Sequence, residues 1–273
     1  MPQIINTNVS SLNAQRNLNS SQGALNTALQ RLSSGLRINS SKDDAAGLAV
    51  AEKMNAQSRG MTVAMRNAND GLSLAQVAEA GMNVIGDHLQ RMRELAVQAA
   101  SGQYDSDNRS ALDTEYQQLA SEINRVISAT NFNNKGLLDG SFSVAVDFQI
   151  GATTGGESQI GIQIDAVNIS TVGSITGSDG SLALAEISVL DAAIDTINNN
   201  RASLGAIQNR FEGVLTQLSA AQENTDAARS RIMDADYASE TANLARAQVL
   251  QQAGVAMLSQ ANALPQNVLS LLR

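Results

Sequence analysis

Residues 187–232 read ISVLDAAIDTINNNRASLGAIQNRFEGVLTQLSAAQENTDAARSRI, and this stretch decides the fold. Steps of three and four residues alternate without a slip through Ile187, Leu190, Ile194, Ile197, Arg201, Leu204, Gln208, Phe211, Leu215, Leu218, Gln222, Thr225, Arg229 and Ile232. This spacing is typical of a coiled-coil seam, and its polar members are typical of positions that fix register. A proline-free helix of this length extends roughly 70 Å at ~1.5 Å per residue. The remainder of the chain must therefore supply partner helices.

The composition favours helices over a sandwich or barrel. Only 3% of the 273 residues are aromatic, and the chain has two prolines and no tryptophan. The absence of cysteine excludes disulfides and thiolate metal sites, and His88 is the single histidine. The start, residues 1–19, lacks a basic region followed by an apolar core, and no run approaches the ~20 apolar residues of a membrane span. We expect a soluble chain without a classical export signal.

Charge is distributed unevenly around a net value of −8. All 26 acidic residues lie between Asp43 and Glu240, whereas six of the 18 basic residues lie outside that range, so the middle of the chain carries −14 and the ends are weakly cationic. An acidic middle argues against nucleic acid as a partner, because phosphate binding requires clustered lysine and arginine.

Further helices are predicted before the seam. Residues 1–42 carry a thin leucine stripe that we expect to stay disordered until it finds a partner: Leu18, Leu25, Leu29, Leu32 and Leu36. Gly35 and the polar run 39–44 indicate a break and a new N-cap. A second helix is predicted from Ala45 to about Ala100, with glycines that suggest close helix approach or bending, and a third from about residue 105 to 131.

The period then changes to two. Alternating apolar residues at 144–150 and 160–164 flank the sequence GATTGG at 151–156, which predicts a β-hairpin. After the rod, a last helix is predicted with a seam that alternates small and large residues: Ala247, Leu250, Gly254, Met257, Ala261, Leu264, Val268 and Leu271. The first and last segments match in length and charge, which favours an antiparallel pair that joins the two ends of the chain.

Candidate chemical sites have simpler explanations. Asp43 with Asp44, and Asp234 with Asp236, could act as paired carboxylates, but both pairs fall at helix starts, where acids cap free N–H groups. His88 lacks a metal-binding HExxH context, and residues 151–156 lack the Lys-Ser/Thr of a phosphate loop. We therefore predict no enzyme, no catalytic residue, no cofactor and no metal.

The fold class predicted from these patterns is mainly α, a long antiparallel helical bundle or coiled coil formed by the N- and C-terminal halves, with a small β-hairpin region. We expect three parts: residues 1–43 with 235–273 as terminal-helix domain, 44–139 with 181–234 as bundle domain, and 140–180 as hairpin region.

Several long motifs resemble bacterial flagellins. The amino-terminal half is similar in NTNVSSLNAQRNL (6–18), ALQRLSSGLRINSSKDDAAGLAVAEKM (28–54), RNANDGLSLAQ (66–76) and LQRMRELAVQAASG (89–102). The carboxyl-terminal half is similar in LGAIQNRFE (204–212), ARSRIMDADYASE (228–240) and QANALPQNVLSLLR (260–273). The likeness covers nearly all of the chain except about 140–180, so the chain looks like a minimal flagellin with a very short variable region.

The resemblance implies a subunit of the secreted, extracellular flagellar filament that serves swimming motility. Its expected partners are many copies of itself, an export chaperone and secretion apparatus, and the filament cap and hook-filament junction proteins, with no nucleic acid and no membrane insertion. The terminal domain is expected to be disordered in the monomer and to fold as a coiled coil on assembly. The residues expected to carry assembly are Leu18, Leu25, Leu29, Leu32, Leu250, Met257, Leu264, Val268 and Leu271.

Flagellins are also ligands of innate immune receptors. The segment recognised by the Toll-like flagellin receptor matches Gln90, Arg91, Leu95 and Glu115 here, although Arg91 and Glu115 could equally be ordinary inter-helix contacts. Three carboxyl-terminal leucines, Leu269, Leu271 and Leu272, resemble the part sensed by a cytosolic receptor.

Rival classes are the hook-filament junction protein, a filament with a proteolytic outer region, and an intracellular coiled-coil scaffold. The unbroken match at both ends favours the bulk subunit over the first. A zinc protease needs histidines that the chain lacks, and a scaffold does not explain acid-free ends matched at opposite termini.

Overall fold

The computed structural model describes residues 7–153, 155–167, 172–177 and 179–271, with the backbone alone for 264–271. The chain divides into two compact units. The terminal unit comprises residues 1–56 and 224–273, and the bundle unit comprises residues 57–223.

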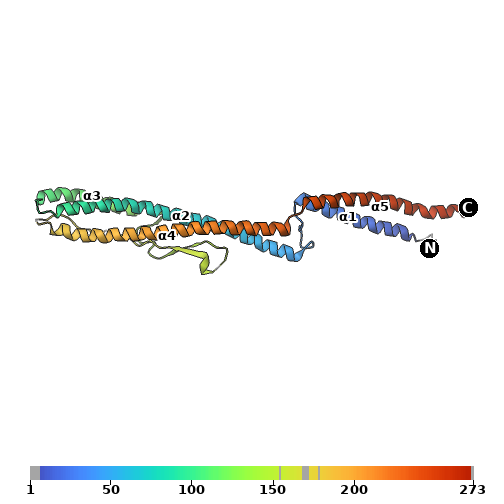
Figure 1. The fold of residues 1–273 in the computed structure, drawn as a ribbon, viewed down its shortest axis with the longest axis horizontal. Helices are drawn as coiled ribbons and strands as arrows, with labels where there is room; N and C mark the ends of the chain where they lie inside the picture. Colours follow the sequence, from blue (N-terminus) through green and yellow to red (C-terminus); the bar gives the residue numbers. More distant parts are fainter. Residues whose placement is uncertain (1–6, 154, 168–171, 178, 272–273) are drawn as a thin grey trace. The chain divides into compact units, whose positions relative to one another are not determined.

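The terminal unit is built on two helices from opposite ends of the sequence, α1 (Val9–Ser34) and α5 (Tyr237–Leu271). They lie side by side and run antiparallel (Figure 1), since Asn8 near the start of α1 contacts Ala261 late in α5, and Arg31 near its end contacts Glu240. The predicted antiparallel pairing of the first and last segments is thus confirmed.

Backbone hydrogen bonds tie together the two connections that border this pair. Gly35 ends α1 in the left-handed conformation with φ 73°, as its place in the predicted break suggested. The Arg37 N–H donates to the Met233 carbonyl at 2.6 Å, and the Ala235 N–H donates to the Gly35 carbonyl at 2.9 Å. The side chain of Ile38 is buried at this junction.

The bundle unit contains α3 (Ser106–Ala129) together with the parts of α2 (Ala45–Ala99) and α4 (Ser181–Met233) that lie within residues 57–223. Figure 1 shows these helices as neighbours, and their buried side chains form one apolar core. Its largest fully buried apolar side chains are Met82, Ile85, Leu89, Met92, Leu95, Tyr116, Ile123, Leu137, Leu138, Ile162 and Phe211. The predicted boundaries of the second helix hold within one residue. The rod ends at Met233, one residue after the predicted seam, but it begins at Ser181, six residues before Ile187.

The seam of α4 follows the predicted repeat with one exception. Leu190, Ile197, Leu204 and Phe211 are buried, and Gln208 and Gln222 face α2, where they donate to Glu79 and Thr62 at 2.8 and 2.9 Å. Arg201, however, is exposed. Asn200 is buried in its place because its side-chain amide exchanges hydrogen bonds with the backbone of Asp165, at 2.9 and 3.3 Å.

The β-structure consists of two antiparallel pairs. The strand β1 (Asn131–Phe132) pairs with β2 (Lys135–Gly136), and β3 (Val146–Gln149) pairs with β4 (Gln159–Ile162), just after the 3-10 turn η1 (Gly156–Ser158). Val146 lies opposite Ile162, and Phe148 lies opposite Ile160. The predicted hairpin is therefore confirmed, although Val144 lies outside the strand and is exposed.

Candidate assembly interface

Polar side chains fix the register of the α1 and α5 pair at both ends and in the middle. The Asn8 Nδ2 donates to the Ala261 carbonyl at 2.7 Å, and the Ser11 Oγ donates to the Asn262 side chain at 2.7 Å. Near the centre, Gln251 donates to Gln22 at 2.7 Å. At the far end, the Tyr237 hydroxyl donates to the Leu32 carbonyl at 3.3 Å.

An ion pair joins Arg31 to Glu240 at 2.9 Å beside this tyrosine. The Glu240 side chain is only 11% exposed, and the Arg31 Nε is buried without a hydrogen-bond partner. Removing either residue leaves a partly buried charge unpaired, which costs more than the pair contributes over neutral residues. The pair therefore selects one register for α1 against α5.

Small residues form the contact between the two helices. Ala247 and Ala261 on α5 are buried, as are Ser11 and Ala28 on α1. Gly254 lies between the two α5 alanines, where an added Cβ would be 3.2 Å from Leu18 Cδ1. Ala247, Gly254 and Ala261, spaced seven residues apart, thus allow α5 to approach α1 closely, because their side chains are small.

Two large members of the predicted α5 seam are more than half exposed. Leu250 is 54% exposed and Met257 is 63% exposed, and Val249 and Val255 beside them are also exposed. On α1, Leu29 is 48% exposed, whereas Leu18, Leu25 and Leu32 are half-buried. The described part of the predicted C-terminal seam is therefore divided: its alanines and glycine pack against α1, whereas Leu250 and Met257 remain more than half exposed.

Three predicted assembly residues remain, Leu264, Val268 and Leu271, in a part of α5 of which only the backbone is described. Their side chains, like those of Leu269 and Leu272, lie outside the described residues. The nine proposed assembly residues consequently fall into three groups. Leu18, Leu25 and Leu32 are half-buried, Leu29, Leu250 and Met257 are exposed, and the side chains of the last three are not described.

The four predicted receptor residues lie on α2 and α3 of the bundle unit. Arg91 forms ion pairs with Glu115 and Glu94, both at 2.9 Å, and all three are exposed, as is Gln90. The hydrogen bonds that Arg91 donates, first to Glu115 and then to Glu94, raise the pKa of its guanidinium. Leu95 is only 1% exposed and packs in the core beneath them.

The paired carboxylates accept hydrogen bonds from groups close to them in the sequence. Asp44 accepts from the Gly47 N–H at 2.8 Å at the start of α2, and Asp236 accepts from the Ala238 N–H at 3.0 Å at the start of α5. Asp43 accepts from the Asn39 N–H and from Ser40, and these hydrogen bonds lower the pKa of its carboxyl. Asp234 accepts instead from the Ser230 hydroxyl at 2.6 Å.

Within the described part of the chain, no group of three or more His, Asp or Glu residues could hold a metal ion. In that same part, no helix is long and apolar enough to cross a membrane.

Arg109 was missed by the sequence patterns. It is 1% exposed, and its guanidinium donates to three carbonyls, those of Ala99 at 2.8 Å and of Ser101 and Gly177 at 3.1 Å. An arginine three residues before an apolar stripe normally lies in solvent, so its residue type gave no signal. It fastens the end of α2 to the loop that precedes α4.

Comparison with known protein families shows to which family the chain belongs. The family model for the bacterial flagellin N-terminal helical region matches residues 5–143, and the model for the bacterial flagellin C-terminal helical region matches residues 187–272. The chain belongs to the bacterial flagellin family. Flagellins are structural proteins that polymerise into the extracellular flagellar filament, so the family accounts for helices that expose apolar side chains.

Flagellins of several bacteria match along nearly the whole chain. The flagellin of Halalkalibacterium halodurans is 42% identical, over 99% of this chain and 100% of the relative. Flagellin FlaB1 of Treponema pallidum is 40% identical, over 99% and 100%. The alignment with flagellin A of Vibrio anguillarum, 36% identical over 98% and 99%, runs over 376 positions, so that flagellin carries residues for which this 273-residue chain has no counterpart. The variable region is minimal here, as predicted.

Two solved structures share the fold. The crystal structure of Bacillus cereus flagellin is 31% identical with a TM-score of 0.50, over 56% of this chain and 88% of that one. A candidate flagellar hook-associated protein of Vibrio parahaemolyticus has a TM-score of 0.60 at 12% identity, over 70% and 100%, and shows the likeness of fold alone.

Proposed function

We propose that copies of this chain polymerise by heterologous helical packing into the filament that drives swimming motility. The observation that carries this proposal is the divided seam of the terminal unit. Leu250 and Met257 keep the spacing of buried coiled-coil positions, yet they are more than half exposed in the single chain. Apolar residues with that spacing are expected to be buried in the functional state, and neighbouring copies supply the missing contact.

The domain division follows from the same reasoning. We assign residues 1–43 with 235–273 to an inner terminal-helix domain, 44–139 with 181–234 to a bundle domain, and 140–180 to the hairpin and shortened variable region. Because the fully buried residues between α1 and α5 are alanine and serine, while Leu18, Leu25 and Leu32 are only half-buried, their pairing buries little apolar surface. The inner domain is then only weakly folded in the monomer and becomes fully ordered on assembly.

Assembly of such a subunit requires other flagellar proteins. An export chaperone and the flagellar secretion apparatus would carry the unfolded chain, the cap protein would place it at the filament tip, and the hook-filament junction protein would receive the first copies. The weakly held terminal helices support this route, since a chain must unfold to pass through a narrow channel.

A second role is binding by the Toll-like flagellin receptor. Gln90, Arg91 and Glu115 present an exposed charged patch on α2 and α3, which supports direct contact. Leu95 would support the patch from the core, because its side chain is buried. Substitution of Arg91 by alanine should weaken receptor binding by the folded monomer, whereas substitution of exposed Arg125 by alanine should leave it unchanged.

Limited proteolysis beside electron microscopy tests the main proposal. The monomer should lose roughly 40 residues from each end, in line with a disordered terminal domain. The intact chain should form long hollow filaments on addition of a precipitating salt or filament seeds, and the trimmed chain should form none. Resistant ends together with no filament would contradict the proposal.

The hook-filament junction protein remains the competing assignment, since the Vibrio hook-associated structure has the same fold. At 12% identity it supports the fold alone. A junction protein would add to seeds without continuing to polymerise, so filament length against time separates the two functions.

A further inference from the structure

The two connections next to the terminal helices are joined by their backbones. Residues 35–37 and 233–235 form an antiparallel β-bridge centred on Leu36 and Asp234, with backbone hydrogen bonds of 2.6 and 2.9 Å on either side of this pair. This connector bridge begins directly after α1 and ends two residues before α5. Both helices therefore extend from one fixed starting point.

The alignment of the connector bridge continues along the terminal pair. Counted from the central pair of the bridge, Arg31 and its partner Glu240 lie 5 and 6 residues away. Asn8 and its partner Ala261, near the other end, lie 28 and 27 residues away. The two helices thus keep a single register between the bridge and their most distant described contact.

Apolar burial specifies this register only weakly. The residues Ala247, Gly254 and Ala261 of α5 pack against α1, while Leu250 and Met257 are 54% and 63% exposed. Burial contributes roughly 25 cal/mol per Å² of apolar surface, so alanine and glycine contribute less than leucine or methionine. A turn of α5 that covered Leu250 and Met257 would therefore not be opposed by the loss of these small side chains.

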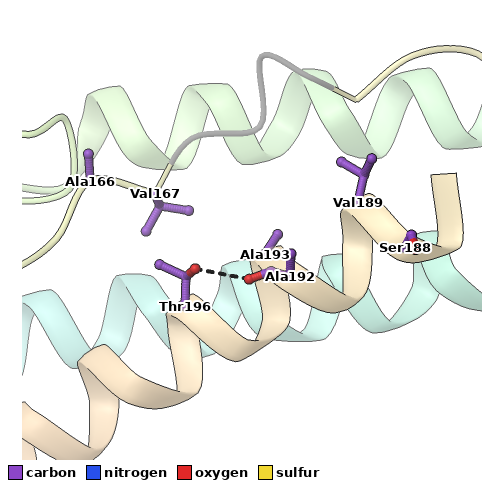
Figure 2. A pocket seen from close by; sticks show the side chains of 7 residues that line it. All are labelled: Ala166, Val167, Ser188, Val189, Ala192, Ala193 and Thr196. Atoms are coloured by element: carbon purple, nitrogen blue, oxygen red, sulfur yellow. Dashed lines mark hydrogen bonds between the residues drawn. The ribbon is translucent and has the colours of Figure 1, made fainter. Parts of the chain in front are cut away.

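Hydroxyl groups on α1 add little to the register. Ser21 and Thr27 donate to carbonyls three and four residues earlier in the same helix, at 2.9 and 3.1 Å. Figure 2 shows the same arrangement on α4, where the Thr196 hydroxyl donates to the Ala192 carbonyl at 2.9 Å. Hydroxyls that bond within their own helix do not specify a neighbouring helix.

The ion pair between Arg31 and Glu240 favours the observed register, but it joins flexible side chains that lose entropy when they are held in one geometry. The connector bridge joins backbone groups instead, and these cannot follow a shift of one residue without breaking both hydrogen bonds. A shift of one residue turns an α-helix by about 100°. The starting point of α5 at the bridge therefore determines which of its residues meet α1.

We propose that the connector bridge sets the register of α1 against α5 and thereby keeps Leu250 and Met257 exposed for contact with neighbouring copies. The register is a property of the single chain, and its use in assembly rests on the proposed polymerisation.

Two matched insertions test the register. One alanine inserted between Ala235 and Asp236 lies between the bridge and α5, so every residue of α5 should move by one position relative to α1. One alanine inserted between Asp43 and Asp44 lies on the α2 side of the bridge and should leave the pair unchanged. Circular dichroism and urea unfolding should show the same bundle unit in both variants.

Disulfide formation reports the alignment, because the chain has no cysteine of its own. Ser11→Cys is combined with Asn262→Cys, since these two side chains are hydrogen-bonded at 2.7 Å. In monomers with the 235/236 insertion this disulfide should form about tenfold more slowly, because residue 262 turns away from residue 11. Ala261→Cys in place of Asn262→Cys should recover the rate there, since residue 261 then occupies the vacated position.

The 43/44 insertion should keep the preference of the parent for the Asn262→Cys reporter. The same preference in the 235/236 insertion, or equal rates for both reporters in every chain, would overturn the bridge as the source of the register.

Seeded polymerisation of the two insertion variants, without the cysteines, tests the use in assembly. The 235/236 insertion should raise the critical concentration about tenfold or more relative to the 43/44 insertion. Equal critical concentrations would overturn the role in assembly. If the unmodified chain forms no filament, polymerisation itself fails, whereas the disulfide rates in the monomer still decide whether the bridge sets the register.

Discussion

Single residues in the bundle core hold polar groups where the helix pattern predicts only apolar ones. Tyr116 and Glu186 meet there, and the tyrosine hydroxyl donates to the carboxylate at 3.2 Å. Burial, followed by the Glu186 charge, raises the pKa of the Tyr116 phenol. In the unfolded chain the same phenol ionises near pH ~10.

Stability of the bundle should therefore fall at alkaline pH. The folded phenol keeps its proton where the unfolded one loses it, so this contribution is complete below about pH 10 and is lost as pH rises above it. Tyr116→Phe should lower the free energy of unfolding at pH 7 by about 1 kcal/mol through the lost hydrogen bond, and should flatten the decline above pH 10. Urea unfolding at pH 7, 9, 10 and 11 measures both. If the free energy of unfolding of the variant fell as steeply as that of the parent above pH 10, Tyr116 would not be the group responsible for the decline.

The same scale shows what sequence patterns miss. The spacing correctly predicted that Tyr116 is buried, because it lies in an apolar stripe. It did not predict that Glu186 and Arg109 are buried, because both are charged and are satisfied by groups distant in sequence. A pattern of hydrophobic residues carries no information on such long-range polar partners.

At the scale of elements, glycines within α2 allow close approach of neighbouring segments. A Cβ at Gly71 would lie 2.7 Å from Phe211 Cζ, and one at Gly81 would lie 2.6 Å from the Thr130 hydroxyl. The Phe211 ring is fully buried and contacts Phe148 edge-on, with centroids 6.1 Å apart. It has little space to move away.

Gly71→Ala should accordingly lower the free energy of unfolding by about 1–3 kcal/mol through overpacking, although alanine is the better helix former by about 1 kcal/mol. Gly213→Ala in α4 provides the control, because an added Cβ there meets nothing within 4 Å. It should raise stability by up to about 1 kcal/mol. Urea unfolding of both variants measures these changes. A Gly71→Ala variant more stable than the parent would contradict the close approach of residue 71 to Phe211.

The divided α5 seam predicts a separation of stability from assembly. Met257→Ser changes an exposed side chain, so helix content and the urea midpoint of the monomer should stay unchanged. The critical concentration for seeded polymerisation should rise several-fold, because neighbouring copies lose an apolar contact. Gln252→Ser, at an exposed polar position of the same helix, is the control. Equal polymerisation of the two variants would remove Met257 from the interface.

The divided seam also marks a limit of prediction at this scale. Spacing along the rod correctly predicted the burial of Leu190, Leu204 and Phe211, whose partners belong to the same chain. It assigned Leu250 and Met257 to a buried seam equally clearly, but a repeat indicates only that a face becomes covered. It does not state whether the cover is the same chain or another copy.

For the whole molecule, the two units differ in how much apolar surface they bury. Among side chains described in the terminal unit, the buried apolar ones are Ala28, Ile38, Ala51, Ala247 and Ala261, four of them alanine. The bundle unit contains the large aliphatic and aromatic core. Local opening should therefore be easier in the terminal unit.

Hydrogen exchange followed by mass spectrometry should show this difference. Amides of α1 and α5 in the monomer should exchange at least about a hundredfold faster than those at 61–99 of α2, which corresponds to an opening free energy lower by ~2.7 kcal/mol or more. In filaments the terminal helices should become as protected as the bundle. Equal protection of both units in the monomer would argue against folding on assembly.

The bond between Asn8 and Ala261 joins residues 253 positions apart, and this distance gives the terminal pair a proofreading property. A copy that stops before α5 still contains the whole of residues 57–223, yet its α1 has no partner. A copy damaged at its start has the complementary defect. If addition to the filament requires the pair, a copy that lacks either end cannot be added. Truncated chains are then excluded from the filament without a separate quality-control protein.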